Sequence, residues 1–253
     1  MVSTAAFHTI LVAWLVLGAG VFVTLLFVTA PYGRHARPGW GPTMPARVGW
    51  VAMELPAVAV MAWLFVSSRR PGAAAAIALL LLWELHYLQR AFVFPALARD
   101  ARVRMPVVIA AMGFVFNVVN GFLQGEWLFH LGPVRDAGWL LRPQFLVGAA
   151  LFLAGLAVNW RADAVLRRLR APGESGYRIP RGGLFELVSC PNYLGEIVEW
   201  TGWAVATWSL PGLAFAAWTA ANLVPRALAH QRWYRTRFPD YPHARTALIP
   251  HLF

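Results

Sequence analysis

The chain has 253 residues, of which 59% are hydrophobic and 13% are charged, and its formal net charge is +11. An ordinary soluble domain contains about 45–50% apolar and about 25% charged residues, so this composition excludes that class. All 22 basic residues are arginines, and they lie in short segments between apolar runs, which argues against a nucleic-acid-binding protein.

Apolar runs of the length that an α-helix needs to cross a bilayer recur along the chain. The first run lacks a basic leader and a small-residue cleavage site, so we expect a retained span rather than a signal peptide. The expected spans are 7–29, 47–66, 73–97, 106–128, 143–166, 184–208 and 213–229. We therefore predict an all-α integral membrane protein, a seven-transmembrane-helix bundle forming one domain over residues 1–253.

The arginine distribution predicts how these spans are oriented. If the N-terminus lies outside, sixteen arginines lie in segments on the inside and only four lie on the outside, namely Arg69, Arg70, Arg135 and Arg142. Inside-facing loops carry the excess of basic residues in membrane proteins. We expect the N-terminus outside and the C-terminus in the cytoplasm.

Charged residues inside spans are costly, and each is a candidate functional residue. Glu54 lies in the middle of the second span, either as a site residue or in a hydrogen bond between helices. Glu84, Tyr87 and Arg90 recur every three residues in the third span and share one stripe. Alternatively, Glu84 and Arg90 form a structural pair.

Amides also share one face of the fourth span. They are Asn117, Asn120 and Gln124. Such amides either contact a cofactor or hold membrane helices together through hydrogen bonds.

The C-terminal half contains two longer polar faces at helical spacing. The first consists of Asn159, Asp163, Arg167 and Arg170, and the second of Arg226, His230, Tyr234 and Arg237. Guanidinium groups bind phosphate in a bidentate way, so several arginines beside a cavity suit a ligand with phosphates. Neighbouring Asn, Asp, Tyr and Glu side chains suit ribose hydroxyls and a carboxamide.

Other kinds of site are not supported. Gly18 and Gly20 begin a pattern like that of soluble dinucleotide-binding folds, but no strand precedes them. The histidines show no metal-binding spacing, and a single cysteine, Cys190, excludes a site of several cysteines. We predict no metal. Ser189 lacks the sequence context of a nucleophile.

Several motifs of residues 159–253 resemble the steroid 5α-reductase family. They include Tyr177-Arg178-Ile179-Pro180, Pro191-Asn192-Tyr193-Leu194-Gly195-Glu196, Glu199-Trp200 and Ala206-Thr207-Trp208-Ser209-Leu210-Pro211. The N-terminal half agrees more sparsely, through Glu54, His86-Tyr87 and Asn120-Gly121-Phe122-Leu123-Gln124. The family is seven-helical and uses NADPH, and its members reduce 3-oxo-Δ4-steroids to 5α-reduced 3-oxo-steroids.

The resemblance implies roles for individual residues. Cofactor-binding residues would be Asn159, Asp163, Arg170, Tyr177, Arg178, Asn192, Glu196, Trp200, Arg226, His230 and Tyr234. Arg167 is added to this set on its spacing from Arg170. In the expected mechanism, hydride reaches C5 of the steroid while Tyr87 and Glu54 polarise the C3 carbonyl. Helices 1–3 (about 1–105) would form the substrate side, and helices 4–7 with their cytoplasmic loops (about 106–253) the NADPH side.

The chain departs from the family pattern after the third span. The family commonly has an Asn-Arg-Gly-Arg-like segment there, where this chain has Arg99, Arg102 and Arg104. We assign Arg102 to the cofactor, with Arg99 and Arg104 as alternatives. Tyr193 stands where some relatives have Phe, a change that we expect to be tolerated.

Three rival interpretations stay open on the sequence. The substrate could be a polyprenol, an enoyl thioester or another enone lipid. The chain could be a membrane methyltransferase using S-adenosylmethionine, since such enzymes share a similar tail, or a lipid-binding or transport protein. The arginine usage and short loops favour a bacterial inner membrane. We expect a monomer that binds a steroid or similar lipid but no nucleic acid.

Overall fold

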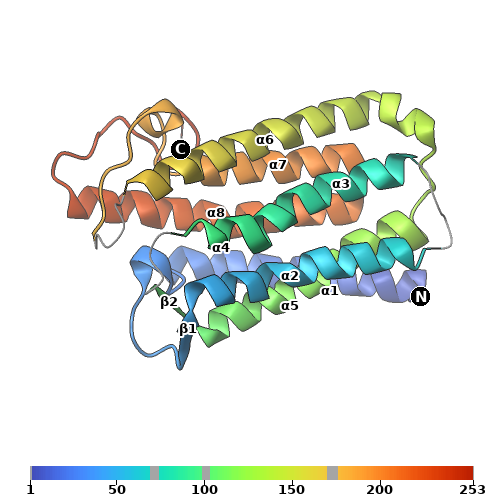
Figure 1. Ribbon diagram of the computed structural model, residues 1–253, viewed down its shortest axis with the longest axis horizontal. Helices are drawn as coiled ribbons and strands as arrows, with labels where there is room; N and C mark the ends of the chain where they lie inside the picture. The colour runs from blue at the N-terminus through green and yellow to red at the C-terminus, as the bar shows by residue number, and fades with distance from the viewer. Residues whose placement is uncertain (1, 69–73, 99–102, 170–175, 253) are drawn as a thin grey trace.

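The computed structural model describes residues 2–68, 74–98, 103–169 and 176–252. Long helices run along the longest axis of the molecule in alternating directions (Figure 1). They are α1 (Thr4–Phe27), α2 (Ala46–Val66), α3 (Ala74–Leu88), α5 (Val107–Glu126), α6 (Pro143–Arg168), α7 (Pro191–Thr207) and α8 (Leu210–Arg237). Shorter helical segments are η1 (Gly33–His35), η2 (Gln89–Val93), α4 (Phe94–Ala96), η3 (Trp127–Leu131), η4 (Ala137–Leu141) and η5 (Gly183–Glu186).

Among the described residues, five helical segments are long and apolar enough to cross a membrane. They are Thr4–Phe27, Ala46–Val66, Ala74–Ala96, Val107–Leu131 and Pro143–Arg168. These segments confirm the positions of the first five expected spans to within a few residues. The expected spans 184–208 and 213–229 correspond to α7 and α8, which pack in the same bundle but are not among the five.

The start of the expected span 184–208 and both ends of the expected span 213–229 differ from the structure. α7 begins only at Pro191, because the preceding residues pair with the C-terminal tail: the backbone N–H of Ser189 donates to the carbonyl of Thr246 (2.8 Å). Ser209 caps the start of α8 by accepting a hydrogen bond from the Gly212 N–H (3.1 Å), so α8 begins at Leu210, before the expected span 213–229. It then continues to Arg237 as a polar helix.

Two short strands interrupt the all-helical architecture. Strands β1 (Thr43–Pro45) and β2 (Arg104–Pro106) pair antiparallel, with Met44 opposite Met105. The side chain of Arg104 reinforces the pairing through Thr43 Oγ1 (2.8 Å). The ladder joins the loop before α2 to the segment before α5.

Helices α6 and α7 approach each other through glycines. A Cβ atom on Gly195 of α7 would lie 2.6 Å from the backbone N of Asn159 and 2.7 Å from the carbonyl O of Gly155 on α6. A Cβ on Gly202 would likewise lie 2.6 Å from the carbonyl O of Gly148. Small residues let membrane helices pack backbone against backbone. This close packing fixes the polar faces of α6 and α7 against each other.

Large aromatic side chains fill the centre of the bundle. Trp83 of α3 is fully buried and contacts the rings of Trp200, Trp203 and Phe215 at centroid distances of 5.5, 5.3 and 5.7 Å. Amides tie the helices together around this core. Gln124 of α5 accepts a hydrogen bond from Trp203 Nε1 (2.9 Å) and donates to the Pro211 carbonyl (2.7 Å). For Gln124, the interpretation in which these amides hold helices together is confirmed.

Candidate active site

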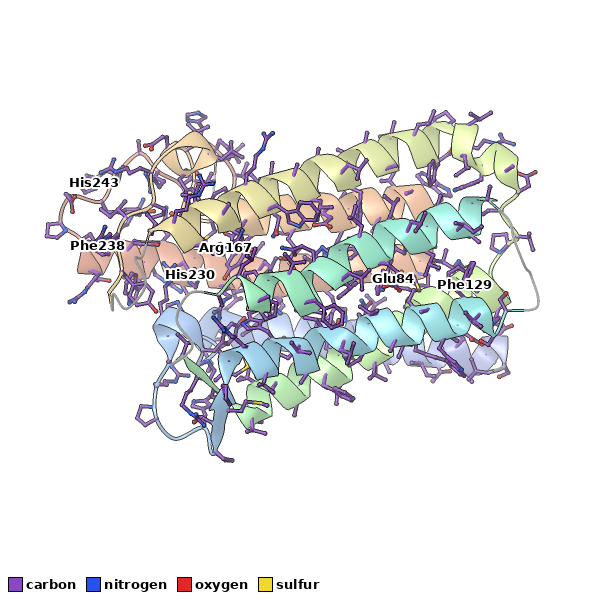
Figure 2. All side chains as sticks on the ribbon, in the orientation of Figure 1. Glu84, Phe129, Arg167, His230, Phe238 and His243 are labelled. Carbon is purple, nitrogen blue, oxygen red and sulfur yellow. The ribbon has the colours of Figure 1, made fainter. Side chains whose placement is uncertain are left out.

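Two groups of polar side chains gather toward one end of the bundle. Figure 2 shows Arg167 and His230 at this end, whereas Glu84 lies toward the other. The loops before β1 and after α8 also lie at this end (Figure 1). Two groups of side chains can be distinguished there. The carboxylate cluster is Glu54, Tyr87, Arg90, Asp163, Glu196 and Glu199; the arginine–histidine cluster is Tyr32, Arg34, His35, Tyr193, Arg226, His230 and Tyr234.

Arg90 lies at the centre of the carboxylate cluster. Its Nη1 is 3.6 Å from Asp163 Oδ2, and its guanidinium lies over the rings of Trp50 (5.0 Å) and Phe94 (4.7 Å). Glu54, Glu196 and Glu199 are also close enough to act on it electrostatically. Arg90 therefore pairs with α6, not with Glu84 as one interpretation of the sequence had it.

The backbone around Arg90 is a π-helical turn, η2, inserted between α3 and α4. Such turns are uncommon inside helices and occur frequently at functional sites. The wider turn changes the direction in which the following side chains leave the helix. Four carboxyl groups around one guanidinium leave acceptor oxygens in excess, so the cluster suits a ligand that brings hydrogen-bond donors.

Glu54 of α2 is held in place by a hydrogen bond from α5. The side-chain Nδ2 of Asn117 on α5 donates to Glu54 Oε2 (3.1 Å) and to the Met53 carbonyl (2.6 Å). Glu54 is 8% exposed and Asn117 is 5% exposed, so this bond lies away from solvent. The hydrogen bond from Asn117 therefore holds Glu54 Oε2 against α5.

Tyr87 lies where the aromatic core meets the carboxylate cluster. Its ring contacts Trp83 (4.6 Å between centroids), His86 (4.9 Å) and Trp200 (5.7 Å). Glu54 is near enough to act on it electrostatically, and the Asn120 side chain lies beside its hydroxyl. A buried phenol has one apolar body and one polar tip, which here faces the polar side of the site.

Helices α6 and α7 contribute a row of polar contacts along their glycine contact. Asn159 Nδ2 donates to the Asn192 carbonyl (3.0 Å) and lies 3.4 Å from Glu196 Oε2. Asn192 Nδ2 in turn lies 3.4 Å from Asp163 Oδ1. The residues expected on α6 and α7 are thus brought together. Trp200 differs from them because it is 1% exposed and lies within the aromatic core beside Tyr87.

The arginine–histidine cluster contains a chain of hydrogen bonds. Arg226 Nε donates to the hydroxyl of Tyr193 (2.9 Å), which is 3.2 Å from His230 Nε2; His230 Nδ1 is 2.9 Å from His35 Nε2. With one arrangement of the protons, the Tyr193 hydroxyl donates to His230 Nε2, and His230 Nδ1 donates to His35 Nε2. This order requires both rings to be neutral.

The environment of His35 supports that assignment. Burial, and then the neighbouring positive charges, lower the pKa of His35 from 6.5 to about 4. The positive charges are Arg226, Arg34 and Arg37. His35 is therefore neutral near pH 7.

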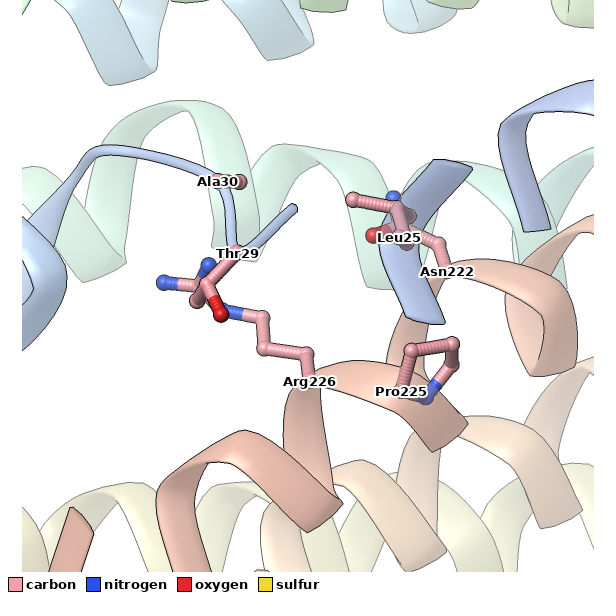
Figure 3. A pocket seen from close by; sticks show the side chains of 6 residues that line it. All are labelled: Leu25, Thr29, Ala30, Asn222, Pro225 and Arg226. Carbon is pink, nitrogen blue, oxygen red and sulfur yellow. The ribbon is translucent and has the colours of Figure 1, made fainter. Parts of the chain in front are cut away.

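The loop after α1 covers the end of α8 through cation–π contacts. Arg34 lies over the rings of Tyr234 (4.5 Å), Trp233 (5.2 Å) and Tyr177 (5.5 Å), and Arg226 lies over the ring of Tyr32 (3.7 Å). A small pocket opens between α1 and α8, lined by Leu25, Thr29, Ala30, Asn222, Pro225 and Arg226, and Figure 3 shows the Arg226 side chain reaching along it.

Unpartnered polar atoms show what kind of ligand this end of the bundle fits. Arg34 Nη1, Arg167 Nη1 and Arg226 Nη1 are buried and have no hydrogen-bond partner among the described residues. A buried guanidinium nitrogen without a partner is costly, and phosphate oxygens would satisfy it. Asn159 Oδ1 on α6 is an acceptor without a hydrogen-bond partner among the described residues. Cationic donors beside acceptor oxygens fit a ligand that carries both phosphate and hydroxyl groups.

Not every expected cofactor residue can be placed. Arg102 and Arg170 lie outside the described residues. Arg178 is exposed, whereas Tyr177 packs edge-on against Trp233 at 4.9 Å between ring centroids. Arg167 is close enough to act on Asp163 electrostatically.

The sequence interpretation missed part of both clusters. Tyr32, Arg34 and His35 lie in a loop without periodicity, and their one signal was basic charge on the expected inner side. His86 and Glu199 were not assigned to the site, although each directly precedes an assigned residue in the chain. Burial of a polar residue in an apolar helix was the signal that could have found them.

The sequence is similar to known proteins along most of its length. A sequence model of the family described as 3-oxo-5-alpha-steroid 4-dehydrogenase matches residues 103–253. The chain is 43% identical to Steroid 5-alpha-reductase DET2 of Gossypium hirsutum, over 98% of this chain and 97% of that protein. It is also 43% identical to 3-oxo-5-alpha-steroid 4-dehydrogenase 1 of Bos taurus (93% of each chain) and 41% identical to that of Homo sapiens (93% and 91%). The chain therefore belongs to the steroid 5-alpha-reductase (3-oxo-5-alpha-steroid 4-dehydrogenase) family.

Proposed function

We propose that this protein reduces the 4,5 double bond of 3-oxo-Δ4-steroids to 5α-reduced 3-oxo-steroids, with NADPH as the reductant. The observation that carries the proposal is the similarity to steroid 5-alpha-reductases along nearly the whole chain. Family membership favours reduction over the methyltransferase and transport interpretations. An enone lipid other than a steroid is the alternative substrate within the same chemistry.

The residues at the polar end of the bundle would hold the cofactor. NADPH, when bound, supplies the hydride that is added to C5 of the substrate. Arg34, Arg167 and Arg226 have unpartnered guanidinium nitrogens for its phosphates. Carboxylate and amide oxygens of Asn159 and Glu196 would accept hydrogen bonds from its hydroxyl and carboxamide groups. Helices α1–α3 would then form the substrate side, and α5–α8 with their loops the cofactor side.

Tyr87 and Glu54 would act on the carbonyl group of the substrate. As C5 is reduced, negative charge develops on the C3 oxygen. A hydrogen bond donated by the Tyr87 hydroxyl to that oxygen would stabilise the transition state more than the ground state. Glu54, held in place by Asn117, would keep the Tyr87 hydroxyl protonated. We assign the proton added at C4 to solvent.

We further propose a seven-span topology with the N-terminus outside and the C-terminus in the cytoplasm, as a monomer in a bacterial inner membrane. Arg34, Arg37, Arg104 and Arg235 belong to segments at one end of the bundle, which would be the cytoplasmic end. The positive-inside rule supports this direction. It places the arginine–histidine cluster within reach of cytoplasmic NADPH.

The Tyr87→Phe variant tests the mechanism. Removing one donor from a developing oxyanion lowers kcat by about 10²–10³-fold. We expect this loss with progesterone as substrate, while the Kd for NADPH changes less than about twofold. The control is Tyr241→Phe, which removes a buried hydroxyl bonded to Ser189 (2.7 Å) outside the site and should keep turnover. Undiminished turnover by Tyr87→Phe would rule out the assigned role.

A further inference from the structure

Two pairs of consecutive residues interlock between α3 and α7. His86 and Tyr87 of α3 face Glu199 and Trp200 of α7, and His86 Nδ1 lies 2.7 Å from Glu199 Oε1. The His86 ring also packs edge-on against Trp200 (4.6 Å between centroids) and against Tyr87 (4.9 Å). The hydrogen bond thus fixes the His86 ring, which lies against both Tyr87 and Trp200.

This polar pair is poorly explained as a source of stability. His86 is 3% exposed and Glu199 is fully buried, and the second oxygen of Glu199 has no hydrogen-bond partner among the described residues. Desolvation of such groups offsets most of their mutual attraction, and apolar residues of the same volume often stabilise as well or better. A buried polar pair can instead contribute a defined geometry, and the geometry here is that of Tyr87.

The backbone next to Tyr87 explains why an anchor is needed there. Regular α-helix ends at Leu88, one residue after Tyr87, and the π-helical turn η2 follows. α3 packs directly against α2, while its connection with α7 runs through side chains such as Trp83 and Trp200. The bond from His86 to Glu199 secures the end of α3 to α7 just before the irregular turn.

We propose that the His86–Glu199 pair positions the hydroxyl of Tyr87 for its role in the reaction. Both residues are positioning residues, because they act through Tyr87. The inference rests on the proposed function of Tyr87. Loss of the pair frees the His86 ring to rotate, and the Tyr87 ring then loses one of the three rings that hold it.

The test is a double-mutant cycle between Glu199→Leu and Tyr87→Phe on the full-length protein in detergent. A misplacement of about 1 Å can lower turnover by about 10²-fold, so we expect Glu199→Leu to lower kcat by about 10- to 100-fold. The Kd for NADPH should change less than about twofold. In the Tyr87→Phe background, Glu199→Leu should change kcat by less than about twofold, because residues that act as a unit are not additive. Multiplication of the two losses would overturn the proposal.

The matched variant is Glu199→Gln, which keeps an oxygen that accepts from His86. We expect it to restore turnover to within a few-fold of the wild type. A loss as large as that of Glu199→Leu would mean that charge rather than position matters, and would also overturn the proposal. Thermal unfolding of each variant separates these effects from misfolding.

A spectroscopic measurement checks the position of Tyr87 without turnover. The chain has six tyrosines, so ¹³C labelling of the ring carbon that bears the hydroxyl gives few resonances, and Tyr87→Phe assigns the relevant one. Glu199→Leu should shift or broaden this resonance, and Glu199→Gln should leave it in place. An unmoved resonance in Glu199→Leu would refute the positioning role. If the wild-type protein reduces no steroid, the proposed function fails; if it does and the losses multiply, only this inference fails.

Discussion

The contact between α6 and α7 makes a quantitative prediction about Gly195. A methyl group there would lie 2.6 Å from the backbone N of Asn159 and 2.7 Å from the carbonyl O of Gly155, where ordinary contacts are at least 3.4 Å. Both atoms belong to helix backbone, so the Gly195→Ala variant can be accommodated only by moving the helices apart by about 0.8 Å.

The expected loss in the free energy of unfolding of Gly195→Ala follows from two opposing effects. Overpacking of a tight core costs about 1–3 kcal/mol, and a gap of 0.5–1 Å forfeits about a quarter to a half of the dispersion energy across it. The higher helix propensity of alanine returns about 1 kcal/mol. We expect a net loss of about 1–3 kcal/mol, which corresponds to a decrease in Tm of about 2–12 °C for a chain of this size.

The control for this prediction is Gly20→Ala in α1. No atom lies within 4 Å of a Cβ at Gly20, so only the gain in helix propensity remains and Tm should stay constant or rise. Both Tm values can be measured in the same detergent by near-ultraviolet circular dichroism. If Gly195→Ala unfolds at or above the temperature of the wild type, the close contact between α6 and α7 does not exist.

Two other predictions concern the arginine–histidine cluster. The Arg226→Gln variant should bind NADPH at least about tenfold more weakly, since a bidentate phosphate contact is lost. The control is Arg232→Gln on the exposed side of α8, which should bind NADPH normally. Equal affinities of the two variants in a fluorescence titration would contradict the cofactor assignment. The second prediction concerns His35, whose pKa is about 4 in the folded protein and 6.5 for a free histidine. Between these pH values the unfolded chain binds more protons than the folded protein, so the free energy of unfolding should decrease as the pH falls from 6.5 to 4. The His35→Gln variant should show a flatter dependence of Tm on pH in that range, and a slope equal to that of the wild type would contradict the assignment.

The sequence predicted the helices well where apolar runs end at strong breaking signals. The expected span 47–66 agrees with α2 (Ala46–Val66) and 143–166 agrees with α6 (Pro143–Arg168), since prolines or charges flank both runs. The error at 184–208 arose because Leu184 and Leu187 are apolar but precede a segment that pairs with the C-terminal tail. Pairing between distant segments leaves no periodic signal.

Helical spacing also predicted which polar residues of one helix share a face. Arg226, His230 and Tyr234 are all buried on α8, and Asn159 and Asp163 are both buried on α6. Spacing cannot identify partners on other helices.

Partners far apart in the chain therefore escaped the sequence interpretation. Arg90 pairs with Asp163, and His86 pairs with Glu199 at a separation of 113 residues. The π-helical turn at Arg90 also breaks the regular spacing on which the expected stripe with Glu84 depended.

The most direct test of the central claim follows the transferred hydrogen. Purified protein would be given a 4-ene-3-oxo-steroid and NADPH deuterated at its transferable position, and the product would be examined by mass spectrometry and NMR. The proposed function predicts a 5α-reduced product with one deuterium at C5 and one solvent hydrogen at C4. A product without deuterium, or no product although NADPH binds, would contradict the steroid 5α-reductase activity proposed for this chain.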